Sequence, residues 1–202
     1  MARTHRIVYL KETASGETFE AELWDEIGER HLADVEEIWQ PALTVLTRWS
    51  GREHRQESSH WNWRAKMRRV RRSRVASSFA VVYRDVTQGV MIVDASRTAR
   101  LEPDCGQGLV YVEYVEVAPW NRAGWKPDRM LQWIGTVLVR AAVNRSIELG
   151  FGGRIGLHSL PQADTFYRHI GMTNLGVDAK YQNLCYFEMT SQQAIAFREV
   201  QP

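Results

Sequence analysis

The sequence has few of the features that mark secreted or membrane-bound proteins. It holds only two cysteines, Cys105 and Cys185, and nothing in their spacing pairs them, so we expect free thiols in a reducing compartment. No apolar run approaches the roughly 18–20 residues that span a bilayer. The basic start Met1–Arg6 precedes a segment too short and too polar for a signal peptide. We therefore expect a cytoplasmic protein with no membrane partner.

The net charge is also small, and the residues that could bind a metal are not grouped. Lys and Arg number 26 against 24 Asp and Glu, a formal net charge of +2. This excludes a globally basic nucleic-acid-binding protein but not a local basic patch. The six histidines and two cysteines show no metal-ligand spacing, so no metal is expected. The Gly-x-Ser-x-Gly motif of serine hydrolases is absent from the sequence.

The composition that remains is that of a globular protein. Hydrophobic residues make up 44% of the 202 residues, enough for a substantial core. We find no internal repeat and no low-complexity linker. Residues 1–202 are therefore interpreted as a single domain.

Apolar periodicity predicts a mixed order of strands and helices. Strands are expected at Arg6–Leu10, Glu17–Leu23, Ser77–Arg84, Gly89–Val93, Leu109–Val117, Ile155–His158 and Gln182–Met189. Helices are expected at Glu29–Trp49, His60–Arg72, Gln132–Leu149 and Pro161–Ile170, with a short helix at the C-terminal end. This order predicts an α/β fold, with a mixed sheet and helices on both faces.

Several local features refine these predictions. A first hairpin should turn around Ser15–Gly16, and the third and fourth strands should be joined near Gln88–Gly89. Pro41 should kink or divide the first helix. The polar segment Arg97–Gly108 is expected to be a loop.

Three segments in the second half of the chain carry familiar motifs. The strand Val112–Pro119 (VEYVEVAP) ends in an apolar-x-Val-x-Pro pattern, and Gln132–Val137 (QWIGTV) has the form Gln-x-x-Gly. Gly153–His158 is followed by Ala163–Met172 (ADTFYRHIGM). In this order they resemble the fourth strand, the pyrophosphate loop, and the fifth strand with the fourth helix of the GNAT acyltransferases. The resemblance covers Val110–Met172.

This resemblance implies a GNAT-type mixed, splayed sheet that binds acetyl-coenzyme A as cosubstrate where the fourth and fifth strands part. A glycine at a helix start lets the backbone approach a phosphate, and the unpaired amides there supply donors. The family's cofactor pairs through its pantetheine with the backbone of the fourth strand. The implied cofactor-binding residues are Val115, Val117, Gln132, Gly135, Thr136 and Val137.

The resemblance also suggests catalytic residues for attack of an amine on a thioester. Tyr167 stands where the family has the tyrosine that protonates the departing thiolate, although a core aromatic residue fits the same position. Glu113 matches the strand acid and is our first candidate for the general base, acting through water, with a salt-bridged carboxylate as the alternative. Glu116 should face the opposite side of the sheet and pair with a cation or reach solvent. His158 is a secondary candidate for the base.

The resemblance is incomplete at three places. Pro119 and Gln132 are thirteen positions apart, so about ten residues within Trp120–Leu131 are additional to the family pattern. Val137 replaces the last Gly or Ala of the loop, and Leu160 replaces an asparagine frequent in the family. The additional segment could form a lid or part of a substrate wall.

A basic run stands outside this pattern. Arg64–Arg74 contains seven basic residues in eleven. A solvated helix face explains most such runs, and contact with RNA phosphates or another acidic partner is the functional alternative. Upstream, Trp61 and Trp63 could line an acceptor pocket or anchor the core.

These observations predict an acetyl-CoA-dependent N-acetyltransferase acting on a primary amine. The acceptor is not identified by the sequence: a small molecule, a protein amine and aminoacyl-tRNA remain open. Two alternatives are an aminoacyl-tRNA-acetylating enzyme of toxin type and a non-catalytic GNAT-fold module that binds acyl-CoA. A homodimer is also left open.

Overall fold

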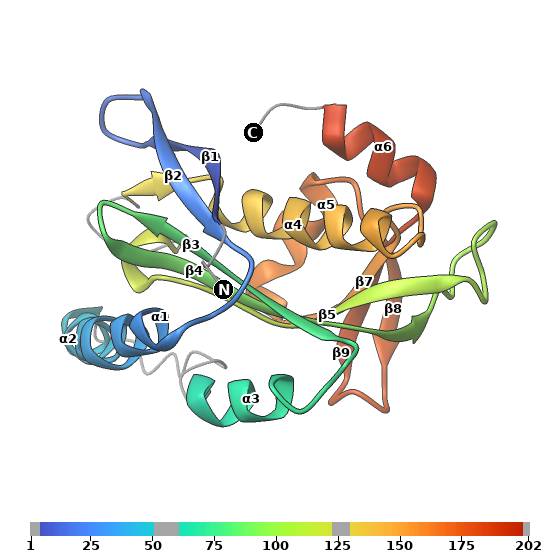
Figure 1. The fold of residues 1–202 in the computed structure, drawn as a ribbon, viewed down its shortest axis with the longest axis horizontal. Coiled ribbons are helices and arrows are strands. Elements are labelled where there is room, and N and C mark those ends of the chain that lie inside the picture. The colour runs from blue at the N-terminus through green and yellow to red at the C-terminus, as the bar shows by residue number, and fades with distance from the viewer. Residues whose placement is uncertain (1–4, 51–60, 123–129, 200–202) are drawn as a thin grey trace. The chain divides into compact units, whose positions relative to one another are not determined.

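The computed structural model describes residues 5–50, 61–122 and 130–199, except the side chains of residues 46–50. The chain forms two compact units. Unit 1 contains residues 1–91 and 115–138, and unit 2 contains residues 92–114 and 139–201. Strands β4 (Val86–Thr98) and β5 (Gly108–Val117) and helix α4 (Ile134–Glu148), which are labelled in Figure 1, each have residues in both units. The single domain expected from the sequence stays a prediction.

The strands of unit 1 pair in antiparallel fashion. β1 (His5–Glu12) and β2 (Thr18–Trp24) form the predicted first hairpin, whose turn contains Gly16 at a φ of +73°. β2 pairs with β3 (Ala76–Tyr83), and β1 also pairs with the two-residue strand β6 (Leu131–Gln132). The first part of β4 and the last residues of β5 complete the strands of this unit.

The predicted helix around Pro41 is divided, as expected. α1 (Glu29–Asp34) and α2 (Gln40–Ser50) are separated by a π-helical turn at Val35–Trp39. Proline has no amide hydrogen, and its ring crowds the carbonyl four residues earlier in a regular helix. The wider π turn directly before Pro41 accommodates this change. The buried Trp39 indole donates a hydrogen bond to the Thr87 carbonyl at 2.9 Å, which fixes the turn to β4.

α3 (Trp63–Val70) is shorter than the helix predicted over residues 60–72. Asn62 accepts a hydrogen bond from the Ala65 amide at 2.8 Å, so its side chain caps the helix and fixes its start. Trp63 and Met67 form its buried stripe. In unit 1, α1, α2 and α3 lie on one face of the strands and the start of α4 lies on the other (Figure 1).

The turn predicted near Gln88–Gly89 is wrong. β3 and β4 are joined at Arg84 and Asp85, whose φ angles of +48° and +64° are typical of a tight two-residue hairpin. Gly89 lies inside β4, where an added Cβ would be 2.6 Å from a methyl group of Ile134. The missing side chain therefore allows α4 to approach the strand, rather than allowing a turn.

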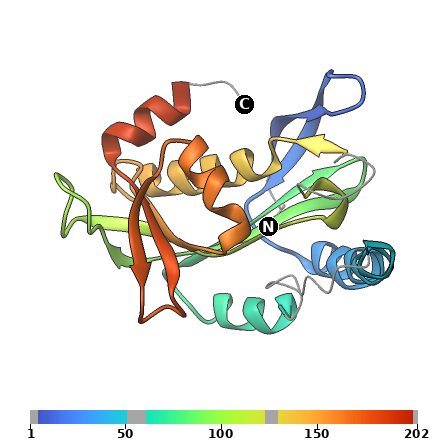
Figure 2. The ribbon, with the colours of Figure 1, turned by 180° about the vertical axis from the view of Figure 1, so that it is seen from behind.

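Unit 2 adds the remaining elements to the shared β4, β5 and α4. They are β7 (Ile155–Ser159), a 3₁₀ turn at Pro161–Ala163, α5 (Asp164–His169), β8 (Thr173–Asp178), β9 (Leu184–Met189) and α6 (Ser191–Glu199). β8 and β9 form an antiparallel hairpin (Figure 2). β8 was not predicted, because its apolar residues Leu175 and Val177 are exposed and a bulge interrupts its alternation. β4 continues to Thr98, so the predicted loop at Arg97 begins later than expected.

The strands form one mixed sheet. Hydrogen bonds join them in the order β6-β1-β2-β3-β4-β5-β7-β9-β8. β5 and β7 are parallel, whereas β7 and β9 are antiparallel. The predicted α/β class, with a mixed sheet flanked by helices, is confirmed.

Glu116 forms a buried ion pair at the end of β5. Its side chain is 5% exposed and accepts hydrogen bonds from the Trp63 indole at 2.6 Å and the Arg122 guanidinium at 2.7 Å. Arg122 Nε also donates to the Val117 carbonyl at 3.0 Å. The prediction that Glu116 pairs with a cation is confirmed. One carboxylate thus joins α3, β5 and the segment that follows β5.

Glu116→Gln should lower the free energy of unfolding by about 3–5 kcal/mol, because the buried Arg122 guanidinium loses its counter-charge. Urea unfolding followed by tryptophan fluorescence measures this loss. Glu148→Gln is the control: it breaks an exposed Arg145–Glu148 pair of 3.1 Å and should cost less than about 1 kcal/mol. Equal losses in the two variants would contradict a structural role for Glu116.

Candidate functional site

The predicted phosphate-binding loop lies at the start of α4 in unit 1. The helix begins at Ile134, after Trp133. Amides in the first turn of a helix have no partner within it, and here they belong to Ile134, Gly135 and Thr136. The Val137 amide donates to the Trp133 carbonyl at 2.8 Å. The Gly135 and Thr136 amides therefore lie where anion donors were expected. The Val137 amide, also expected to be a donor, is already hydrogen-bonded within the helix, and the third unpaired amide is that of Ile134.

Trp133 has a left-handed backbone conformation that could not be predicted from the sequence. Its φ of +76° lies in the left-handed region, which is unfavourable for a bulky side chain. Pairing of Gln132 with Lys11 fixes the chain just before it, and the Gln132 side chain donates to the Thr13 hydroxyl at 3.4 Å. The Lys11 ammonium lies 5.9 Å from the centre of the Trp133 ring. Such strain is typically found at functional sites. The backbone conformation of Trp133 directs the chain into the start of α4.

Val115 and Val117, the expected partners of the pantetheine, are half-buried near the end of β5. The Val117 carbonyl accepts the hydrogen bond from Arg122 Nε, and the following Ala118 amide donates to the Gln88 carbonyl at 2.9 Å. One lone pair of the Val117 carbonyl is therefore already used within unit 1. Its second lone pair is what a pantetheine amide would have to use.

The side-chain amides of Gln88 and Asn121, which carry no signal in the sequence, bond to the two ends of the additional segment. Gln88 Oε1 accepts hydrogen bonds from Trp120 Nε1 at 3.0 Å and from Asn121 Nδ2 at 2.8 Å. Asn121 Oδ1 accepts one from the Leu131 amide at 2.9 Å. The two described ends of the segment therefore meet at one buried cluster next to β6. Residues 123–129 themselves, in which a lid or wall was expected, lie outside the described residues.

β5 and β7 pair over a short distance only. The parallel ladder joins Val110–Val112 to Ile155–Leu157. Both strands extend beyond it within unit 2, β5 through Glu113 and Tyr114 and β7 through His158 and Ser159. A ladder that ends before its strands do is the form expected where two strands splay.

The two predicted catalytic residues belong to unit 2, whereas the predicted cofactor residues belong to unit 1. Glu113 is half-buried on β5. Tyr167 is buried on α5, with its ring 5.2 Å from that of Phe166 and 5.7 Å from that of Phe187. Burial, with a further contribution from the Asp164 carboxylate, raises the pKa of the Tyr167 phenol. The phenol therefore stays protonated at neutral pH and keeps a proton to donate.

His158 lies in a chain of hydrogen bonds that the sequence did not reveal. Its Nδ1 is 2.7 Å from the Tyr111 hydroxyl, and its Nε2 is 3.3 Å from Asp178 Oδ2. The Tyr181 ring stacks on the imidazole at 3.9 Å. Burial lowers the pKa of His158, and the Asp178 carboxylate acts in the opposite direction. A neutral imidazole fits this arrangement, with Nε2–H donating to Asp178 and Nδ1 accepting from Tyr111.

The arginines of the basic run Arg64–Arg74 have two kinds of environment: one is ion-paired and the others are exposed. The Arg64 guanidinium bonds to Glu29 and, at 2.8 Å, to Glu36, so it ties α3 to the preceding helices. The other arginines of the run are exposed: Arg68, Arg69, Arg71, Arg72 and Arg74. Trp63 is buried, so it anchors the core, which is one of the two roles considered for it.

The described parts of the chain contain neither a metal-ligand cluster nor a membrane-spanning helix. Within residues 5–50, 61–122 and 130–199, no three His, Cys, Asp or Glu side chains gather as metal ligands would. None of the helices in these ranges is both long and apolar enough to cross a membrane. Cys105 and Cys185 are free thiols, as expected.

Comparison with known proteins identifies the fold. The PaiA N-acetyltransferase of Thermoplasma acidophilum, solved in complex with coenzyme A, is 12% identical with a TM-score of 0.55, over 85% of this chain and 99% of its own. The GNAT domain of S. lividans PAT is 12% identical with a TM-score of 0.57, over 92% and 96%. FeeM, an N-acyl amino acid synthase from uncultured soil microbes, is 12% identical with a TM-score of 0.50, over 96% of each chain.

The fold is therefore that of the GNAT acetyltransferases, as the motifs in Val110–Met172 suggested. The first two of these neighbours and the chain match over most of both lengths. By sequence alone, no family model and no curated protein matches the chain.

The buried His158 should make stability depend on pH. Its pKa is lowered in the folded state, so below about pH 6.5, the ordinary value for histidine, the unfolded chain binds the proton more readily. The free energy of unfolding should fall between pH 7 and 5, by at most about 1.4 kcal/mol per pH unit from this group. His158→Gln should reduce the fall, as measured by urea unfolding at both pH values. His169→Gln, at an exposed position, is the control, and an undiminished fall in His158→Gln would contradict the assignment.

Proposed function

We propose that this protein is an N-acetyltransferase that moves an acetyl group from acetyl-CoA to a primary amine. The observation that carries the proposal is the start of α4, where first-turn amides follow a strained Trp133 at the Gln-x-x-Gly motif of a GNAT fold. A helix N-terminus with a glycine in its first turn is well suited to a pyrophosphate. The coenzyme A complex of a structural neighbour supports the same cosubstrate.

The residues present fit coenzyme A. The Ile134, Gly135 and Thr136 amides would hold the pyrophosphate, with Gln132 beside them and the Val115 and Val117 backbone for the pantetheine. Val137, which replaces the last Gly or Ala of the family's loop, has a buried side chain. Its side chain therefore packs in the interior, and its amide forms a hydrogen bond to the Trp133 carbonyl at the start of α4.

The chain's own residues would supply the proton transfers. Attack on the thioester requires a neutral amine, and Glu113 would accept the ammonium proton through a water molecule. The departing thiolate requires a proton, which Tyr167 would donate from its buried phenol. The bound acetyl-CoA supplies the activated acyl group. His158, linked to Tyr111 and Asp178, is the second candidate for the base.

Calorimetric titration with acetyl-CoA tests the cofactor site. Binding in the micromolar range is expected, and Gly135→Glu should abolish it, because a carboxylate would occupy the anion site. Gln192→Glu is the matched control, since it places the same charge at the second residue of another helix, α6, and should leave binding intact. Absence of binding by the unmodified protein would refute the proposed enzyme.

A second experiment tests the proton transfers. Tyr167→Phe should lower kcat by about 10²-fold with little change in the KM for acetyl-CoA, since it removes only the proton donor. Glu113→Gln should move the pH profile of kcat/KM towards higher pH, where more of the amine is already neutral. Steady-state kinetics with a panel of primary amines measures both effects. An unchanged kcat would remove Tyr167 as the acid, and an unshifted profile would transfer the base to water or His158.

The exposed arginines of α3 favour one alternative acceptor, aminoacyl-tRNA. Five guanidinium groups reach solvent on and just after this helix, as a phosphate-binding surface requires. Retention of tRNA that disappears when Arg68, Arg69, Arg71 and Arg72 are neutralised would support it, and indifference to tRNA would exclude it. A non-catalytic acyl-CoA-binding module is distinguished by coenzyme binding without turnover of any amine. A cytoplasmic location and a homodimer stay predictions.

A further inference from the structure

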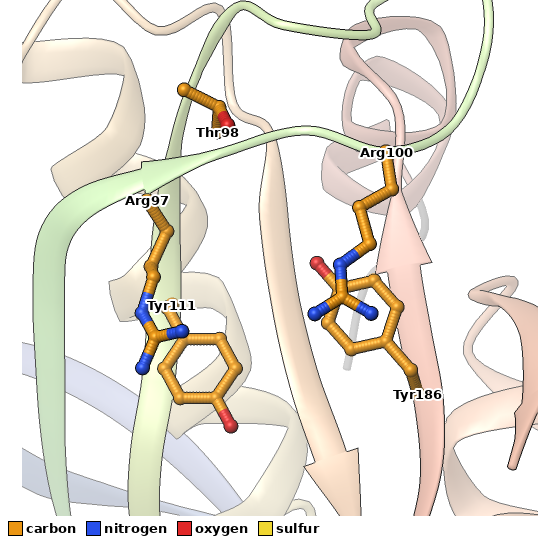
Figure 3. Close-up of a pocket in the computed structure, with 5 residues that line it drawn as sticks. All are labelled: Arg97, Thr98, Arg100, Tyr111 and Tyr186. Atoms are coloured by element: carbon orange, nitrogen blue, oxygen red, sulfur yellow. The ribbon is translucent and has the colours of Figure 1, made fainter. Parts of the chain in front are cut away.

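An open pocket in unit 2 is lined by two arginines and two tyrosines. Its volume is about 150 Å³, and its walls are Arg97, Thr98, Arg100, Tyr111 and Tyr186. Figure 3 shows the Arg97 guanidinium beside the Tyr111 ring and the Arg100 guanidinium across the Tyr186 ring. The residues come from the end of β4, the loop after it, β5 and β9. Two cations are therefore presented on aromatic surfaces at the mouth of one cavity.

Arg97 is the unusual member of this pocket. Its guanidinium carbon lies 4.7 Å from the centre of the Tyr111 ring and 5.6 Å from that of Tyr181, and it donates a hydrogen bond to the Tyr181 hydroxyl. No carboxylate among the described residues forms an ion pair with it. Asp94, the nearest acid of its own strand, accepts hydrogen bonds from the Ser96 amide and hydroxyl instead. Arg97 thus holds a full positive charge with donors still unfilled.

Two acidic groups beside the pocket, Asp178 and Glu188, are already engaged by other partners. Asp178 accepts a hydrogen bond from Arg100 at 2.8 Å and one from the Lys180 amide at 3.0 Å. Glu188 is fully buried, and its carboxylate accepts the Arg100 and Leu101 amides as well as the Tyr186 hydroxyl. Asp178 therefore neutralises the Arg100 guanidinium. Of the two cations that line the pocket, Arg97 is the one left to a ligand.

This charge pattern selects the kind of ligand. One unpaired guanidinium matches one monoanion, and its planar fork fits a carboxylate by two parallel hydrogen bonds. A phosphate dianion would bring its second charge near Asp178 and Glu188, and the residues that line the pocket offer no second unpaired cation to it. The Tyr111 and Tyr186 rings, on which the two guanidinium groups lie, form the rest of the lining beside a bound carboxylate.

We propose that this pocket binds a carboxylate of the acceptor, so that the preferred amine is one that also carries a carboxylate group, with Arg97 as its main contact. This inference rests on the proposed acetyltransferase function for its kinetic consequence, but the binding of a carboxylate can be tested without any turnover.

The binding test uses phenylacetate and its neutral analogue 2-phenylethanol, each titrated into the ¹⁵N-labelled protein without coenzyme A. Arginine side-chain N–H signals are followed by NMR, and Arg97→Gln assigns the relevant one. Phenylacetate should give a saturable shift of the Arg97 signal, and 2-phenylethanol none. No saturable shift, or equal shifts with both compounds, would overturn the proposal.

The kinetic test compares phenylalanine with 2-phenylethylamine, which differ by the carboxylate. The protein should prefer phenylalanine, and Arg97→Gln should reduce this preference by about 10- to 100-fold, the usual effect of losing a charge-assisted hydrogen bond. Arg97→Lys keeps the charge and should retain part of the preference. Arg84→Gln is the matched control, because Arg84 also stacks on two rings, those of Phe19 and Tyr83, and lies in the β3–β4 turn.

The outcomes separate the two hypotheses. If no amine is acetylated, the proposed function fails, and the NMR titration still decides the carboxylate site. If amines are acetylated but Arg97→Gln leaves the preference unchanged, the carboxylate site is refuted while the function stands. An increase in the KM for acetyl-CoA alone in Arg97→Gln would assign the pocket to the cosubstrate and overturn the proposal.

Discussion

The buried carboxylate of Glu116 constrains the part of unit 1 from which a cofactor site would be made. A charge this far from water is stable only with close donors, and Trp63 and Arg122 provide them. Arg122 in turn bonds to the Val117 carbonyl, so the same network fixes the last residues of β5. The backbone geometry of Val117, which would pair with a pantetheine, therefore depends on the Glu116–Arg122 ion pair, even without contact between that ion pair and the pantetheine.

In unit 2, two tyrosines link a charged guanidinium to a neutral imidazole. Tyr111 and Tyr181 hold Arg97 by their rings and a hydroxyl, and Tyr111 also bonds to His158. Burial raises the pKa of Tyr111 to about 12, so its phenol remains a neutral donor. Phenols that stay neutral can connect a guanidinium, an imidazole and a ligand without adding a charge of their own.

The sequence predicted most of the architecture, and its failures have local physical causes. Apolar periodicity located α4 and the helical region around Pro41, because burial on one face leaves a strong pattern. The first hairpin and the division of the helix were predicted from the turn residues Ser15–Gly16 and from Pro41. β8 was missed since its apolar residues face solvent, and the Arg84–Asp85 turn was missed since neither residue is a usual turn glycine. The strained Trp133 and the Gln88–Asn121 cluster depend on contacts between distant segments. Motif spacing placed Gly135 and Thr136 at the helix start, but not the hydrogen bond of Val137.

The interleaved course of the chain has a consequence for how this protein could change over time. Residues 92–114 of unit 2 lie in sequence between the two parts of unit 1, and residues 115–138 of unit 1 lie between the two parts of unit 2. Neither half is a continuous stretch of gene. A single crossover cannot exchange one half for a homologous one, and no single cut releases an intact unit. One crossover anywhere along the chain therefore joins segments of two parents inside at least one unit. Substitution within the candidate acceptor pocket leaves both units intact.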